Sequence, residues 1–315
     1  MSGALNLLRG RVWLITLLAL VALIVINAIF QKNLFTPNVL KSNLTVFLPL
    51  VLIAIGQTYV VLAGDIDLSV GATVALVNVV TVTVITLVGG DVTAVLIGLA
   101  AGIATGVACG VFNGLLVALL RFQPIVTTFA TSIIFGGIAL RIMPTSGVPV
   151  PAPYWRGYAS GLFGVPTVVL IFVGALLVVA FMASRPFIKH LTAVGGQRAA
   201  AFQTGLKVSR IRIQAYALSG LFAALGALCL TGETASGDPL MGKTLALASV
   251  SAVVLGGTAL AGGSGSAFGS VLGALVVGMI GNVIFFAGLP FEYQTLVQGL
   301  ITLAALAGGV LVSRR

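Results

Sequence analysis

Long apolar runs recur along nearly the whole 315-residue chain, and short segments between them carry most of the charges. A helix needs about 20 apolar residues to cross the hydrocarbon layer of a bilayer. About ten runs reach or approach this length, so we expect an all-α membrane protein with about ten transmembrane helices. The runs cover residues 12–30, 43–64, 70–88, 92–120, 124–142, 165–183, 213–231, 244–262, 267–288 and 291–312.

Composition supports this class. Apolar residues make up 59% of the chain and charged residues 7%, against about 25% charged in an ordinary soluble domain. The net charge of +10 does not indicate nucleic acid as a partner, because the basic residues lie between apolar runs rather than along one face. Membrane lipid is the expected surrounding.

The basic residues also predict an orientation. An even number of spans places both termini on one side, and with both termini in the cytoplasm most of the sixteen Lys and Arg residues face inward. This distribution satisfies the positive-inside rule. The run at 12–30 is longer than a signal-peptide core and is expected to remain as the first span.

One long segment, residues 184–212, is basic and lacks any carboxylate. The orientation predicts that it is cytoplasmic. Its Gly- and Ala-rich part, residues 195–205, is expected to fold as one compact helix. On that helix Ala199, Phe202 and Leu206 would form a single apolar face. Such an element could serve as the binding site of a soluble motor protein that drives a membrane transporter.

The chain also shows an internal similarity. Residues 67–76 align with residues 238–247, and a glycine-rich span follows each of them. This predicts two repeats, at about 12–142 and 165–312, each of five spans. An odd number of spans forces the two copies to insert in opposite directions, which places a solute path near their interface at mid-membrane. The alternative is that apolar, glycine-rich sequence aligns with itself by chance.

Polar residues next to the spans are candidates for the solute path. They are Asp65, Asp67, Asn78, Asn113 and Asn282. The acids could equally serve the start of a helix, where a side chain accepts free backbone N–H groups. The amides at 113 and 282 could equally form hydrogen bonds between helices, because a buried amide is costly when unpaired.

Enzymatic and metal chemistry find little support. Residues 237–244 satisfy the pattern of a phosphate-binding loop, but they have no strand before them and no later magnesium-binding Asp, so we treat the match as chance. The single histidine, His190, has no nucleophile arranged around it. Metal-ligand spacings are absent. We therefore expect no enzyme activity, no metal and no cofactor bound by this chain.

Three segments together resemble a known family. Residues 54–72, 193–208 and 252–278 (AIGQTYVVLAGDIDLSVGA, AVGGQRAAAFQTGLKV and AVVLGGTALAGGSGSAFGSVLGALVVG) are similar to the ribose-type permeases of bacterial ABC sugar importers. The resemblance covers essentially the whole chain. It implies a single permease domain, 1–315, in a bacterial inner membrane. Its implied partners are a second permease subunit, a cytoplasmic ATPase that binds ATP and Mg, and a solute-binding protein.

The resemblance also implies a role for the 195–205 stretch as the coupling helix that docks in the ATPase. The residues that match the family motif, or stand within it, are Gly195, Gly196, Gln197, Arg198, Ala200, Ala201, Phe202 and Gly205. The chain departs from the family at Asp65, which replaces a glycine. It departs again at 245–248, which lack an acid. The resemblance therefore implies a small sugar without naming it.

Other functions stay open at this point. A branched-chain amino-acid or nucleoside permease of the same transporter class would have a similar architecture. A standalone facilitator or secondary transporter would work without an ATPase, although no ionisable residue lies in the middle of an expected span. An intramembrane enzyme is the third alternative, and the missing catalytic groups argue against it.

Overall fold

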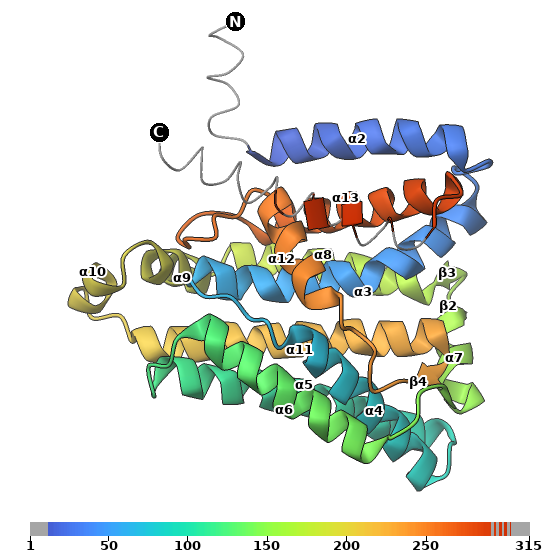
Figure 1. The fold of residues 1–315 in the computed structure, drawn as a ribbon, viewed down its shortest axis with the longest axis horizontal. Coiled ribbons are helices and arrows are strands. Elements are labelled where there is room, and N and C mark those ends of the chain that lie inside the picture. The colour runs from blue at the N-terminus through green and yellow to red at the C-terminus, as the bar shows by residue number, and fades with distance from the viewer. Residues whose placement is uncertain (1–11, 291–292, 294–295, 298, 301–302, 304–315) are drawn as a thin grey trace, which may run out of the picture.

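The chain folds almost entirely into helices, as the computed structural model shows (Figure 1). It describes residues 12–290 together with 293, 296, 297, 299, 300 and 303. Six described helices are long and apolar enough to cross a membrane. They are α3 (Pro37–Leu62), α4 (Val70–Val88), α5 (Val92–Ala118), α6 (Pro124–Ile142), α11 (Val208–Thr234) and α13 (Ala267–Phe286). The all-α membrane fold is confirmed.

The remaining elements are shorter or bent. α8 (Thr167–Ala183) and α9 (Pro186–Gly196) pass the same test only as a pair, and they meet at an angle of 71°. The other helices are α2 (Val12–Phe30), α7 (Ala152–Ala159), α10 (Arg198–Gln203) and α12 (Leu245–Leu255). Two antiparallel pairs of very short strands complete the described chain. β1 (Val148–Pro149) pairs with β4 (Ser236–Gly237), and β2 (Gly161–Leu162) pairs with β3 (Val165–Pro166).

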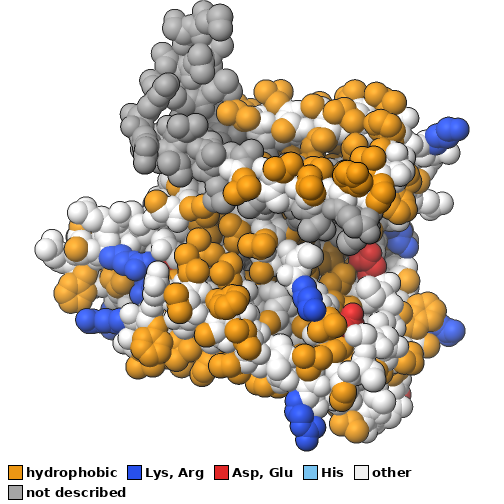
Figure 2. Space-filling model, in the orientation of Figure 1, with side chains coloured by type: hydrophobic (Ala, Val, Ile, Leu, Met, Phe, Trp, Pro, Cys, Tyr) orange, Lys and Arg blue, Asp and Glu red, His pale blue; other side chains and the backbone are white. Residues whose placement is uncertain are grey.

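Two helices, α3 and α11, lie at the centre of the bundle (Figure 1). In α3, 83% of the apolar window is buried, against 28% in α5 and in α6. α13 and α2 flank the central pair on one side, while α4, α5 and α6 lie on the other. The outer helices expose apolar side chains over much of the surface, as Figure 2 shows. This exposure suits lipid, which is as apolar as the side chains themselves.

Glycines allow the closest helix contacts. A Cβ on Gly106 of α5 would overlap the carbonyl oxygen of Gly220 on α11, and a Cβ on Gly220 would overlap that of Gly106. Two backbones that approach this closely gain dispersion contacts and weak hydrogen bonds. The glycine-rich face of α5 is thus a packing surface.

Two non-helical connections run into the body of the bundle (Figure 1). Residues 63–69 join α3 to α4, and residues 235–244 join α11 to α12. The helices that follow them begin side by side, where Gly71 of α4 lies directly against Gly242. A Cβ on either glycine would overlap the other residue's carbonyl oxygen.

Several expected spans have different limits. The helix expected at 213–231 begins earlier, at Val208. The helix expected at 244–262 is shorter than expected, because α12 ends at Leu255. Gly256 packs against the backbone of Gly269, and Gly257 takes a positive φ of 84°, which stops the helix. Most of the expected span at 291–312 lies outside the described residues.

The contact between Gly71 and Gly242 can be tested by adding one methyl group. We expect Gly71→Ala to lower stability by about 1–3 kcal/mol, because an extra group in a closed contact forces the backbones apart. The measurement is thermal unfolding of the purified protein in detergent. Gly174→Ala on α8 is the control, since a Cβ there would meet nothing within 4 Å. Equal stability of the two variants would contradict the close contact.

Candidate functional site

The segment predicted to couple the protein to a motor projects from one end of the bundle (Figure 1). It is not one helix from 195 to 205, so that expectation is wrong. α9 ends at Gly196, Gln197 is extended with φ −154° and ψ 94°, and α10 then begins at Arg198. The chain next turns at Gly205, which has a positive φ of 84°. The break allows the chain to reverse its direction.

The short helix α10 presents its side chains in two directions. Ala201 is buried and Ala200 is half-buried, so these residues attach the helix to the bundle. Phe202 points outward and is 72% exposed. A Cβ on Gly205 would meet no neighbouring atom. This end of the segment is therefore open to a partner.

The apolar face expected for this helix does not include Leu206. Ala199 and Phe202 are exposed. Leu206 instead packs against the hydrophobic core and lies beyond the end of α10 at Gln203. The expectation assumed that helical spacing continues to residue 206, but the turn at Gly205 ends it.

A junction of glycine backbones joins α9 to the bundle. A Cβ on Gly195 would overlap the carbonyl oxygen of Leu62, the last residue of α3. Gly263, in the loop before α13, donates a backbone hydrogen bond to the same oxygen at 3.1 Å. Gly262 lies against Gly64 in the same way. Three segments distant in sequence thus meet where only glycine fits.

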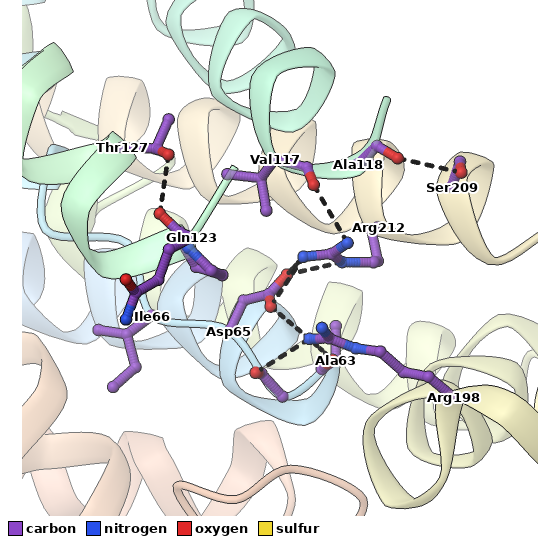
Figure 3. Close-up of polar contacts among 12 residues, drawn as sticks. Ala63, Asp65, Ile66, Val117, Ala118, Gln123, Thr127, Arg198, Ser209 and Arg212 are labelled. Atoms are coloured by element: carbon purple, nitrogen blue, oxygen red, sulfur yellow. Dashed lines mark hydrogen bonds and ion pairs between the residues drawn. The ribbon is translucent and has the colours of Figure 1, made fainter. Parts of the chain in front are cut away.

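Asp65 lies beside this junction and forms a buried ion pair (Figure 3). Arg212 of α11 donates from Nε to Oδ2 at 2.9 Å and from Nη2 to Oδ1 at 3.0 Å. A third nitrogen of this guanidinium, Nη1, donates to the carbonyl oxygen of Val117 at 3.2 Å. Arg198 of α10 also contacts the carboxylate. The Asp65 side chain is fully buried.

Asp67 has a different environment, since no cation pairs with it among the described residues. Its Oδ1 accepts hydrogen bonds from the backbone N–H of Ser69 at 2.9 Å and from the Ser69 hydroxyl at 2.6 Å. The hydroxyl of Ser219 donates to Oδ2 at 3.2 Å. Asn113 of α5 donates from Nδ2 to the Ser69 hydroxyl oxygen at 2.7 Å. These contacts attach the 63–69 connection to α5 and α11.

The other two candidate amides lie elsewhere. Asn78 of α4 is fully buried and donates to the hydroxyl of Thr231 at 2.7 Å, while its Oδ1 accepts from the backbone N–H of Asp238 at 2.8 Å. Asn78 therefore binds the second connection, residues 235–244, and not the first, residues 63–69. Asn282 lies on α13, and its Nδ2 has no hydrogen-bond partner within the described chain. The five candidates therefore do not form one cluster.

Arg212 was not among the predicted site residues. Its charge was counted only toward the orientation of the 184–212 segment, yet it holds Asp65 together with Arg198, which was predicted as a coupling residue. A signal was present, because Asp65 lies next to an apolar run and a buried carboxylate needs a cation. Nothing local in the sequence indicates which cation is near.

A basic groove of about 1400 Å³ opens beside α10. Arg121, Arg198 and Lys207 line it, together with Phe202, and none of its lining residues in the described structure is acidic. Figure 2 shows Lys and Arg side chains at this end of the molecule and at the opposite end as well. An exposed aromatic ring beside several cations is a surface suited to a protein partner.

Comparison with known proteins assigns the family. A family described as "Branched-chain amino acid transport system / permease component" matches residues 39–306. The chain belongs to this permease family. It is 36% identical over 297 residues to the ribose import permease protein RbsC of Bacillus subtilis (strain 168), which covers 92% of this chain and 90% of the relative. No solved structure matches the chain significantly.

Two further members of the family have similar coverage. RbsC of Escherichia coli (strain K12) is 34% identical over 308 residues, or 94% of each chain. The L-arabinose transport system permease protein AraH of the same organism is 34% identical over 302 residues, covering 94% of this chain and 90% of the relative. The predicted resemblance to permeases of sugar importers is confirmed.

The pair of Asp65 and Arg212 can be tested by a double-mutant cycle. We expect Asp65→Asn to cost about 3–5 kcal/mol of stability, because it leaves the Arg212 guanidinium buried without a counter-charge. The double variant Asp65→Asn/Arg212→Gln should cost less than the sum of the single changes. Thermal unfolding in detergent measures all three variants. Additive costs would contradict the interaction.

Proposed function

We propose that this chain is the permease subunit of an ATP-driven ABC importer for a monosaccharide or a similar small sugar. The observation that carries the proposal is its similarity to RbsC and AraH, which extends over 92% and 94% of the chain. The printed names of these relatives specify ribose and L-arabinose. The family description names branched-chain amino acids, so a test has to include both solute classes.

In this proposal the chain carries no catalytic site of its own. A partner ATPase in the cytoplasm binds ATP and Mg and also binds α10. Three features support the assignment. Phe202 is exposed, the groove beside it is basic, and Ala201 attaches the helix to the bundle. The remaining partners are a second permease subunit and a solute-binding protein on the opposite side of the membrane.

We also infer ten spans in two inverted five-helix repeats, with both termini in the cytoplasm of a bacterium and the protein in its inner membrane. The same sequence alignment that pairs Asp67 with Asp238 also pairs the residues of α3 with those of α11, α4 with α12 and α5 with α13. The aligned glycines Gly71 and Gly242 contact each other, as residues on a two-fold axis would.

Helix contacts repeat under the same alignment. A Cβ on Gly102 would meet Thr81, and a Cβ on the aligned Gly273 would meet Ala252, the counterpart of Thr81. Gly98 and Gly269 behave likewise toward residues 85 and 256. Sequence alignment by chance would not reproduce individual contacts between helices, so these pairs support the repeat.

The same symmetry supports a location for the solute path. Inverted repeats of other transporters bind solute near mid-membrane, where interrupted helices begin. Here α4 and α12 begin next to each other at Gly71 and Gly242. Of the candidate residues, Asp67 and Asn113 belong to the polar cluster that leads to this point.

Reconstitution tests the proposed function. The purified chain, its cognate ATPase and its binding protein are placed in liposomes, and labelled D-ribose, L-arabinose and L-leucine are offered in turn. We expect ATP-dependent uptake of a sugar and none of leucine. Uptake of leucine alone would favour the amino-acid alternative. Uptake by the chain without ATPase or ATP would overturn the importer assignment.

Docking is tested at the exposed aromatic residue of α10. We expect Phe202→Asp to abolish co-purification of the ATPase, because a carboxylate replaces the apolar ring at the proposed contact. Folding should be unchanged, since the ring is 72% exposed. The control is Phe163→Asp in the β2–β3 turn at the other end of the bundle, where the ring is 97% exposed. Retained co-purification with Phe202→Asp would contradict the docking site.

A further inference from the structure

We infer that Arg198 and Asp65 form a releasable link that transmits movement of α10 to the 63–69 connection. The inference rests on the proposed function, because it assumes that α10 is moved by an ATPase. Both residues act as positioning residues, and neither is assigned a contact with the solute.

The two arginines on Asp65 differ in a way that suggests different roles. The Arg212 side chain is 9% exposed and holds the carboxylate through two parallel hydrogen bonds. The Arg198 side chain is 44% exposed and contacts Asp65 through one nitrogen, Nη2. A buried bidentate pair is costly to break, whereas water can replace a partly exposed contact. The ion pair of Asp65 with Arg212 is thus the permanent one, and the ion pair with Arg198 is the one that can be released.

Arg198 reaches the connection at more than the carboxylate. The same nitrogen lies 3.3 Å from the carbonyl oxygen of Ala63 and 3.1 Å from that of Gly64. Figure 3 shows the side chain extending from α10 toward this turn of the backbone. One guanidinium therefore contacts three consecutive residues at the end of α3. No other ion pair joins α9 or α10 to the rest of the described chain.

The connection passes any movement on to other helices. Two residues beyond Asp65, Asp67 is held by Ser69 and Ser219. Leu68 donates its backbone N–H to the hydroxyl oxygen of Thr128 on α6 at 3.0 Å. α4 begins immediately after Ser69. A displacement of residues 63–65 is thus transmitted to α4, α6 and α11, around the point where α4 meets α12.

The proposed role of Arg198 depends on its contact with Asp65 and not only on the positive charge of α9 and α10. Lys189 on α9 is also a cation of this segment, and it is exposed. It makes no side-chain ion pair with the rest of the described residues. A change at Lys189 alters the charge of the segment and leaves the link to Asp65 intact. Lys189→Gln is therefore the matched control for Arg198→Gln.

The test uses the complete complex of permease, ATPase and binding protein in liposomes. We expect Arg198→Gln to keep its thermal stability. Because Arg198 also lines the groove beside α10, the ATPase content of each complex is quantified before its activities are compared. The ratio of labelled D-ribose imported to ATP hydrolysed should fall about five-fold or more, the lower end of typical coupling between sites. Lys189→Gln should keep the wild-type ratio. L-arabinose replaces D-ribose if the wild-type complex imports it better.

A second measurement does not depend on the sugar. Hydrogen–deuterium exchange of peptides covering residues 63–69 is compared with and without Mg-ATP. We expect ATP to change exchange there in wild type and in Lys189→Gln, and to leave it unchanged in Arg198→Gln. Failure of wild type to import any sugar would count against the proposed function alone. An ATP-dependent change in Arg198→Gln equal to that in wild type would overturn the link, as would loss of ATPase binding by this variant.

Discussion

The structure depends on one constraint: inside a membrane, every backbone N–H and C=O group needs a hydrogen-bond partner within the protein. Lipid offers no donors or acceptors, so non-helical chain can run into a bundle only where the protein itself supplies partners. Two such connections, 63–69 and 235–244, enter the bundle here. Central helices and several buried polar side chains, among them Ser69, Asn78 and Asn113, enclose these connections.

Each connection is enclosed by side chains from the opposite half of the chain or from a neighbouring helix. In the first connection the Asp67 carboxylate accepts a hydrogen bond from the backbone N–H of Ser69. In the second, the Asp238 carboxylate accepts one from the backbone N–H of Leu240, which is also two residues later in the chain. Ser219 of α11 supports the first, and Asn78 of α4 supports the second. Each half therefore contributes a side chain to the connection of the other half.

The sequence predicted much of the helical fold because the length of an apolar run reports the cost of transfer to lipid. The expected spans at 70–88 and 124–142 agree with α4 and α6. Apolar character does not report where a helix stops inside the bundle, so α12 was expected to be longer. Its end depends on the contact of Gly256 with Gly269, which exists only after the helices pack. Arg212 was missed for a similar reason, since an ion pair between distant positions leaves no local signal.

The two connections differ in one respect, and this difference bears on how a motor could act. The second is held at its end by uncharged donors and by a short strand pair, with Ser146 donating to Asp238 at 2.7 Å. The first is joined through Asp65 to α10, an element that projects from the bundle and keeps an exposed face. Symmetric halves would respond alike to a force applied at their interface. If an ATPase moves α10 as proposed, the ion pair on one half alone passes that movement to the first connection, and the contact of Gly71 with Gly242 links this connection to the second.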